Sequence, residues 1–424
     1  MFNYDGNQLA QWANNVARAL ETANGAHLAL LLRSKSDKLA LDKLYSIDER
    51  SFSQFIQSYF AKYDKRIVPG ISQFFTDYLK LRVIIAGDTF SWEDVIKKAF
   101  KLLDQWMDIY LSESVVEHHW LVPPMYTICN IITKIGTIAD KVGSMNPTAQ
   151  DLDGDEDKDK YMKQVLSNVR SKMGRVRGDE TRHSAYIVLL GQSIKGCMQL
   201  GNMQMAAGFL KAIESTTINY ARALRGPLIN YCYYLGKLHM QKEEYFESEE
   251  HLSWAFSNCL KDNIDMRRHI LECLIVVRIG LGKLPPLGLL RKYGLDHYYD
   301  LVHAITSGNV KKFSDTIDTY ADTFIREGTI LCVEQLKYIA YRTFIKNVKK
   351  WWNTHEPTEK NNMLPIGVLT CAIRTTMPQM SDNEMLCICA NMIKRSYMKG
   401  YISWERLTIV FSAIQPFPPI CHQG

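Results

Sequence analysis

Four basic residues share one side of a helix predicted at Leu331–Trp352. They are Arg342, Lys346, Lys349 and Lys350, spaced at i, i+4, i+7 and i+8, so a helix presents them as a single stripe. A row of cations suits a phosphate backbone, and the Trp351-Trp352 pair at the helix end suits stacking on bases. The alternative is a solvated face near a helix C-terminus, where cations complement the helix dipole and the tryptophans belong to the core.

A second basic group falls on the helix predicted at Asn383–Lys399, which carries Lys394, Arg395 and Lys399. Gly400 and the β-prone segment Tyr401-Ile402-Ser403 follow, as at the end of a winged helix. In winged helices the corresponding helix either enters a major groove or packs between subunits. Nucleic-acid contact and subunit contact both remain open here.

Residue patterns typical of catalysis and metal binding are missing. The chain has no Gly-x-x-x-x-Gly-Lys-Ser/Thr loop, no Gly-x-Gly-x-x-Gly after a strand and no Gly-x-Ser-x-Gly elbow. The neighbours His118-His119, and likewise Cys387 and Cys389, point in different directions on a helix and cannot readily share an ion. We expect no enzyme activity, no catalytic residue, no metal and no cofactor.

Composition favours a folded intracellular protein. The 424 residues carry a net charge of +6. No apolar run approaches the roughly 18 residues of a membrane span, and the stretch Met1–Leu20 has too many polar residues for a signal peptide. The ten cysteines follow no disulfide or zinc spacing, so we expect buried, reduced thiols.

Charge is unevenly distributed. The acidic run Asn146–Lys160 is predicted to be a mobile, solvated loop. Between Tyr161 and Asn230 there are ten lysines and arginines against three acids. The cluster Arg170–Gly178 in this part is predicted to be an exposed loop that docks acidic partners or phosphates, unless it serves only solubility and pairing with the acidic run.

Apolar residues recur at helical spacing almost throughout the chain. The segment Ile229–Leu260 has the pattern of a tetratricopeptide (TPR) hairpin, with Gly236 and Ala255 allowing its two helices to approach closely. Only one such copy fits well. We therefore predict an all-α fold: a divergent, right-handed TPR-like solenoid capped by a C-terminal winged helix. The predicted regions are 1–200 with its acidic loop, 201–330 with the repeats, and 331–424 with the winged helix and tail.

The C-terminal motifs resemble a known module. They are Ser307-Gly308-Asn309, Phe313, Phe324-Ile325-x-x-Gly328, Leu336, Tyr341-Arg342, Ile345-Lys346 and Lys399-Gly400-Tyr401-Ile402-Ser403. This series resembles the PCI domain, shared by the proteasome lid, the signalosome and translation-initiation factor three. With Tyr231, Tyr233-Tyr234, Gly236 and Ala255-Phe256, it is similar to one branch of that family. The branch holds the subunit-twelve-type protein of the signalosome and the PCI subunit of the nuclear transcription–export complex.

The resemblance extends from about Arg222 to Pro418, and the first 200 or so residues match only in being helical. The tail Gln415-Pro416-Phe417-Pro418 departs from the branch's Asn-Pro-Phe-Pro in its first residue, a small change.

The resemblance implies a non-catalytic scaffold subunit that binds RNA or DNA and acts in mRNA processing, splicing or transcription-coupled export. It implies a location in the nucleus, with the cytoplasm as a second site. The implied partners are a second PCI protein of the large export-scaffold type, bound through the winged helix, and a small acidic disordered subunit along the helical layers. For that subunit the segment Leu290–Tyr341 offers Tyr293, Tyr298, Tyr299, Lys311 and Lys312. The alternative is a protein-only scaffold of a signalosome-like complex linked to cullin deneddylation.

Overall fold

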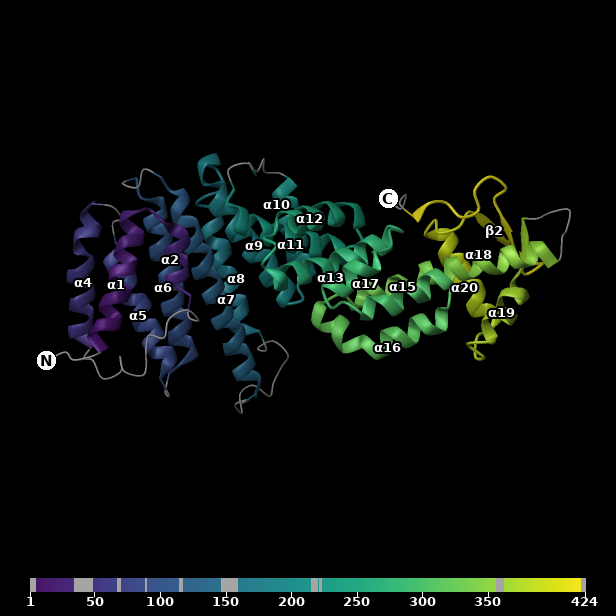
Figure 1. Ribbon diagram of the computed structural model, residues 1–424, viewed down its shortest axis with the longest axis horizontal. Coiled ribbons are helices and arrows are strands. Elements are labelled where there is room, and N and C mark those ends of the chain that lie inside the picture. The colour runs from purple at the N-terminus through teal and green to yellow at the C-terminus, as the bar shows by residue number, and fades with distance from the viewer. Residues whose placement is uncertain are drawn as a thin grey trace. The chain divides into compact units, whose positions relative to one another are not determined.

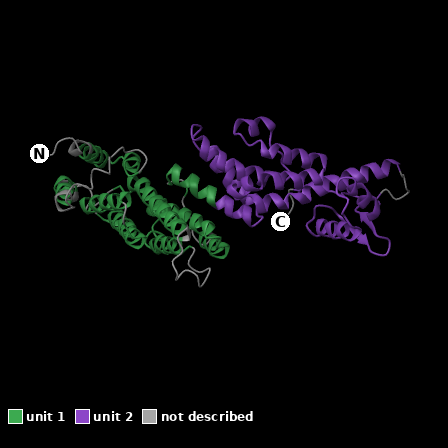
Figure 2. Cartoon of the chain, turned by 90° about the horizontal axis from the view of Figure 1, so that it is seen from below, with its two compact units in different colours: residues 1–234 green, residues 235–424 purple. Residues whose placement is uncertain are grey.

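The computed structural model describes residues 5–33, 49–66, 70–87, 90–113, 117–145, 159–214, 220, 223–355 and 362–420. Most of the acidic segment predicted as a loop, residues 146–158, lies outside the described residues. Contacts divide the chain into two compact units, Met1–Tyr234 and Leu235–Gly424 (Figure 2). The three regions expected from the sequence stay a prediction.

The first unit is helical in its described residues (Figure 1). Its helices are α1 (Asp5–Glu21), α2 (Gly25–Leu31), α4 (Glu49–Arg66), α5 (Ile71–Ala86), α6 (Trp92–Leu111), α7 (Val122–Met145), α8 (Lys160–Met173), α9 (His183–Gln199) and α10 (Met203–Glu214). Helix α11 (Arg225–Gln241) crosses the unit boundary. From α4 to α10, each helix packs on the next, which is the contact pattern of a helical repeat.

The second unit begins with stacked helices and ends in a small mixed fold. Its elements are α12 (Tyr245–Asn258), α13 (Ile264–Gly280), α14 (Leu287–Lys292), α15 (His297–Ser307), α16 (Val310–Glu327), α17 (Ile330–Gln335), α18 (Lys337–His355), β1 (Met363–Pro365), α19 (Ile366–Arg374), α20 (Asp382–Lys394), β2 (Gly400–Ser403) and β3 (Thr408–Phe411). The strands form an antiparallel sheet in the order β1-β3-β2. The sequence predicted helical repeats followed by a winged helix, and this fold class is confirmed.

Two small residues hold the hairpin of α11 and α12 together, as predicted. A Cβ added at Gly236 would lie 2.7 Å from the side chain of Leu252. The Ser248 hydroxyl donates to the carbonyl of Gly236 at 2.7 Å, and Ala255 is fully buried. The two helix backbones therefore lie too close for larger side chains.

The motif Ser307-Gly308-Asn309 sets the turn between α15 and α16. Gly308 has φ +72°, and a Cβ there would lie 2.7 Å from the backbone nitrogen of Phe344 in α18. Asn309 caps α16 by accepting from the amide of Lys312 at 2.9 Å. The turn thus brings α15, α16 and α18 together.

Two predicted helix bounds differ from the structure. The helix expected at Leu331–Trp352 is divided at Leu336 into α17 and α18. The helix expected at Asn383–Lys399 ends at Lys394, because Ser396 takes a left-handed φ of +58° and the amide of Tyr397 donates back to the carbonyl of Met392. Lys399 therefore lies beyond the helix, next to β2.

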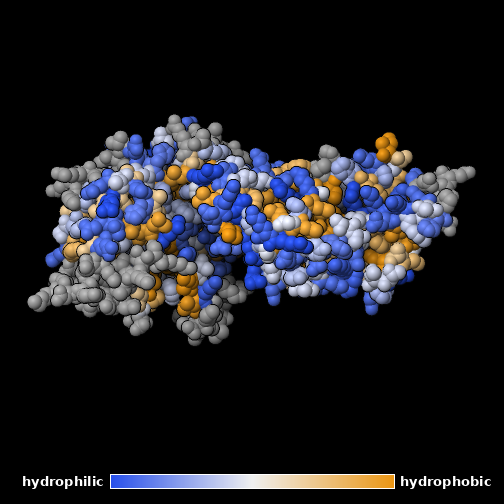
Figure 3. All heavy atoms as spheres, viewed as in Figure 1, coloured by the Kyte–Doolittle hydropathy of each residue, from blue (hydrophilic) through white to orange (hydrophobic). Residues whose placement is uncertain are grey.

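Exposed apolar side chains lie in small groups among hydrophilic ones on the face that Figure 3 draws. Three of the exposed apolar side chains lie at the wing, namely Tyr401 in β2 and Trp404 and Leu407 between β2 and β3. Among the described residues, no helix combines the length and apolar character needed to cross a bilayer.

Candidate nucleic-acid and partner surfaces

Arg342 in α18 binds its own chain. Its guanidinium donates to the carbonyl of Tyr397 at 3.1 Å and to that of Pro418 at 2.7 Å. The group also lies 5.6 Å from the ring centre of Phe417, and burial lowers its pKa. Arg342 therefore binds the C-terminal tail of its own chain. In this role it differs from the other residues of the predicted stripe.

The remaining stripe residues differ in exposure. The ammonium group of Lys349 lies 5.3 Å from the ring centre of Phe411, and burial lowers its pKa. Lys346 and Lys350 are exposed. Trp351 is 53% exposed and stacks on His355 with ring centres 4.7 Å apart. The described part of α18 thus carries two exposed lysines and a half-exposed tryptophan, with His355 covering one face of the tryptophan ring.

Arg395 at the end of α20 is also engaged within the chain. It donates to Gln335 Oε1 at 3.1 Å and lies 4.9 Å from the ring centre of Tyr338. A longer ion pair joins it to Glu243 at 3.5 Å. Lys394 and Lys399 are exposed. Of the seven predicted nucleic-acid residues, the exposed ones are therefore lysines, while both arginines connect the winged helix to the helical layers.

Two of the predicted partner residues are buried. Tyr298 is 0% exposed, and its hydroxyl lies 2.9 Å from Glu327 Oε2 and 3.2 Å from the carbonyl of Glu272. Burial raises its pKa well above the ordinary value. Tyr293 is buried too, and its hydroxyl accepts from Arg267 at 2.9 Å. Neither ring is accessible to a partner.

The other three predicted partner residues lie at the surface, close to acids. Tyr299 is exposed on α15. Lys311 pairs with Asp315 at 2.6 Å, and Lys312 pairs with Asp300 at 3.5 Å. Each lysine thus has a local counter-charge, so this surface has little net attraction for an acidic chain.

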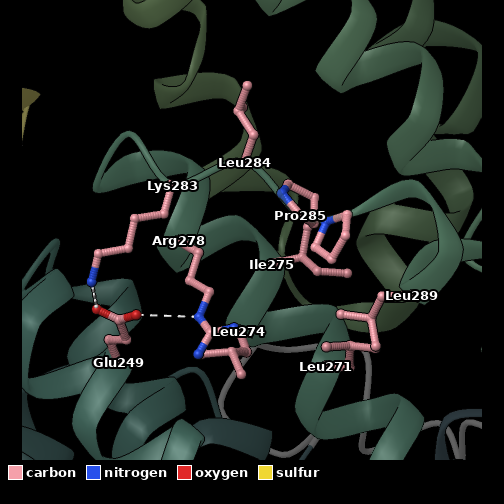
Figure 4. Close-up of a pocket in the computed structure, with 10 residues that line it drawn as sticks. Glu249, Leu271, Leu274, Ile275, Arg278, Lys283, Leu284, Pro285 and Leu289 are labelled. Carbon is pink, nitrogen blue, oxygen red and sulfur yellow. Dashed lines mark hydrogen bonds and ion pairs between the residues drawn. The ribbon is translucent and has the colours of Figure 1, made fainter.

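A pocket of about 340 Å³ in the second unit was not predicted from the sequence. It lies between α12, α13 and α14 (Figure 4), with Leu271, Leu274 and Ile275 among its apolar lining residues. At its edge Glu249 binds both Arg278 at 3.2 Å and Lys283 at 2.6 Å. Its only sequence signal is the Pro285-Pro286 break after α13, which marks a loop but no binding site.

The cysteines were predicted to be buried, and two of the described ones are not. Cys371 and Cys387 are exposed, because each lies on the outer face of its helix. Burial raises the pKa of the Cys389 thiol to about 12. Among the described residues, no group of His, Cys, Asp and Glu is arranged to hold a metal ion.

Comparison with known proteins identifies relatives by sequence. PCI domain-containing protein 2 of Xenopus laevis is 24% identical over 420 residues, which cover 97% of this chain and 97% of that protein. Its counterpart in Danio rerio is 25% identical over 418 residues, covering 97% and 98%. Protein CSN12 homolog of Neurospora crassa is 25% identical over 391 residues, covering 85% and 86%. No family model matches the chain.

These matches extend the resemblance beyond the limits set from the motifs. The sequence alone indicated likeness from about Arg222 onward, whereas the first two relatives match 97% of the chain and therefore most of the first unit as well. Over nearly its whole length the chain is thus similar to PCI domain-containing protein 2, and over most of it to Protein CSN12 homolog.

Proposed function

We propose that this chain is a non-catalytic scaffold subunit of a nuclear complex that binds RNA or DNA and acts in mRNA processing, splicing or transcription-coupled export. The observation that carries the proposal is that α18 exposes Lys346, Lys350 and Trp351, whose ring is stacked on His355 on one face. The similarity to PCI-domain proteins supports the scaffold role.

The chemistry of this face favours binding without reading a sequence. Lysine is a flexible point charge, suited to phosphate and poorly suited to the bidentate contacts that discriminate bases. A base stacks on an exposed aromatic ring only where it is unpaired, and every base offers a ring face. The face therefore favours single-stranded RNA or DNA. Lys394 and Lys399 supply further phosphate contacts near the wing.

The winged helix is proposed to pair with a second PCI protein. Strand β2 is an edge strand, and Tyr401, Trp404 and Leu407 expose apolar surface beside it. An edge strand flanked by apolar side chains suits pairing with another chain.

A small acidic subunit is proposed to bind the helical layers of the second unit. The predicted surface at Tyr299, Lys311 and Lys312 has its charges paired. The pocket in Figure 4 is better suited, because it combines an apolar lining with Arg278 and Lys283 around a single acid, Glu249.

The alternative is a protein-only scaffold of a signalosome-like complex linked to cullin deneddylation. One relative is named Protein CSN12 homolog, which is the observation that favours it. Affinity purification with mass spectrometry separates the two: export-scaffold and splicing proteins support the first function, and cullin-linked subunits support the second.

RNA binding is tested with Lys346→Glu/Lys350→Glu in the purified chain. Loss of two phosphate contacts should weaken binding of labelled single-stranded RNA and lower the slope of log K against log salt by about 1.4. The matched control is Lys97→Glu/Lys98→Glu, which reverses two exposed lysines of α6 with the same change in net charge. Equal affinity and slope in the two variants would remove the α18 face from the proposed function.

A further inference from the structure

The outward face of α12 carries two exposed aromatic rings with an acid between them. Phe246, Glu250 and Trp254 are spaced at i, i+4 and i+8, so they form one stripe on the helix. Phe246 is 48% exposed and Trp254 is 37% exposed. The opposite side of α12 enters the core through three buried residues, Ser248, Leu252 and Ala255. The two rings therefore lie on the side of α12 that faces away from its core contacts.

Five glutamates fall between residues 243 and 250, and they differ in whether a cation neutralises them. Three of them have a lysine or arginine partner, namely Glu243, Glu244 and Glu249. The other two, Glu247 and Glu250, are exposed and form no ion pair with a lysine or arginine of the described chain. The carboxylates without a basic partner are thus the two on the outward face, three residues apart.

Local electrostatics does not account for both of these carboxylates. Glu247 lies in the first turn of α12, where the helix dipole favours an acid, but Glu250 lies beyond that turn. His251 interacts electrostatically with both, yet burial lowers its pKa, so at neutral pH it is an uncharged ring and supplies no counter-charge. Like charges three residues apart on a helix repel each other. A cation from outside the chain would relieve this repulsion, so the face is complementary to a basic partner.

We propose that this face of α12 is the docking site for a basic amphipathic helix of another protein, with arginine as its main cation. An arginine fork binds a carboxylate through two parallel hydrogen bonds and also stacks on aromatic rings, so one residue type suits both the acids and the rings. Apolar side chains one turn away on the partner helix cover the rest of the ring surface. The stripe from Phe246 to Trp254 is about 12 Å long at 1.5 Å per residue, which matches a little over two turns of the partner.

The sign of its charge separates this face from the other surfaces of the chain. Glu247 and Glu250 repel nucleic acids, anionic lipids and acidic peptides, so the face selects a partner of the opposite charge. It shares no residue with the lysines of α18, with the wing or with the pocket in Figure 4. The inference therefore does not depend on the proposed function.

The test is fluorescence anisotropy with the full chain and a labelled, stapled synthetic helix that carries arginine and leucine at helical spacing on one face. Glu247→Gln/Glu250→Gln keeps the size of both side chains and removes both charges. It should weaken binding by at least about tenfold, the factor that one hydrogen bond between charged groups supplies. The matched control is Asp318→Asn/Asp322→Asn, which removes two exposed acids of α16 in the same unit and should bind as the original chain does. A peptide with glutamate in place of every arginine should not bind.

A second readout uses Trp254 itself. The peptide contains no tryptophan and covers this ring, so docking should change the tryptophan emission of the chain. Trp254→Phe should lose most of that change while its thermal unfolding stays close to that of the original chain. Absence of binding to the original chain, equal affinity of the α12 and α16 variants, or an emission change that persists in Trp254→Phe would overturn the inference. Dimerisation in sedimentation that is lost in Glu247→Gln/Glu250→Gln and in Lys346→Glu/Lys350→Glu alike would also overturn it, because the face would then be covered by a second copy of this chain.

Discussion

At the residue scale, His269 makes the stability of the second unit depend on pH. Its Nδ1 lies 3.1 Å from Glu272 Oε2, and Glu272 is buried while also bound by Arg268 at 3.1 Å. The hydrogen bond with Glu272 raises the pKa of His269. Because the folded pKa is the higher one, the stabilisation is fully present below the unfolded value near 6.5 and is lost as pH rises through the folded value.

The substitution His269→Gln should therefore lower the midpoint of urea unfolding at pH 6 and have a diminishing effect at higher pH. Unfolding curves of both chains from pH 6 to pH 8.5 measure this. In a Glu272→Gln background the same substitution should lose its pH dependence, because the carboxylate that raises the pKa is gone. A difference that stays constant with pH in the original background contradicts this account.

Residue types and spacing predicted the basic stripe but not the role of each member. Periodicity placed Arg342, Lys346 and Lys350 on one helix, which is correct. It could not show that Arg342 binds the carbonyls of Tyr397 and Pro418, because those groups are 55 and 76 residues away. Tyr298 fails for the same reason: its burial depends on Glu272 and Glu327 from other helices.

At the element scale, the close contact of α11 and α12 has a measurable consequence. Gly236→Ala places a methyl group 2.7 Å from the Leu252 side chain, below any normal contact distance. Alanine is otherwise better than glycine inside a helix by about 1 kcal/mol. We expect the overlap to outweigh this gain and to lower the free energy of unfolding by about 1–3 kcal/mol, measured by urea unfolding.

Gly143→Ala in α7 is the matched control. A Cβ there meets nothing within 4 Å, so only the helix preference acts and the variant should be as stable as the original chain or more so. Stabilisation of both variants would show that α11 and α12 adjust freely, and that the fit at Gly236 has no role in the hairpin.

Helices were predictable as elements, whereas their ends were not. Hydrophobic periodicity predicted helices almost throughout the chain, and the described residues are mostly helical, since this signal lies within each helix itself. The stop after Lys394 depends on the left-handed backbone of Ser396, a conformation that serine seldom adopts and that the residue type does not predict. The winged-helix sheet was predictable only in part: β2 follows from its local sequence, but β1 and β3 become strands through pairing with each other.

At the scale of the whole second unit, the tail after β3 joins the winged helix to the helical layers. Lys399 donates its amide to the carbonyl of Pro416 at 2.9 Å, and Phe417 packs on Phe411 with ring centres 5.5 Å apart. Farther along, Ile420 lies against Gly282 in the turn after α13, 3.3 Å from where a Cβ would be. The tail therefore bridges the sheet and the helical layers within this unit.

Because the tail bridges these two parts of the unit, we expect substitutions in the tail to change the protection of amides in segments that are distant in the sequence. Phe417→Ala/Ile420→Ala should speed amide hydrogen exchange both in β3 and in the turn at Gly282, because each loses the side chain that covers it. Hydrogen exchange followed by mass spectrometry measures both segments together. Ile414→Ala is the control, since Ile414 is in the same tail but 96% exposed. Faster exchange in β3 alone would mean that the tail belongs only to the winged helix. Faster exchange in both segments, with Ile414→Ala unchanged, would mean that contacts of Phe417 and Ile420 fix the winged helix on the helical layers. These contacts would then also fix the direction in which Lys394 and Lys399 face a partner.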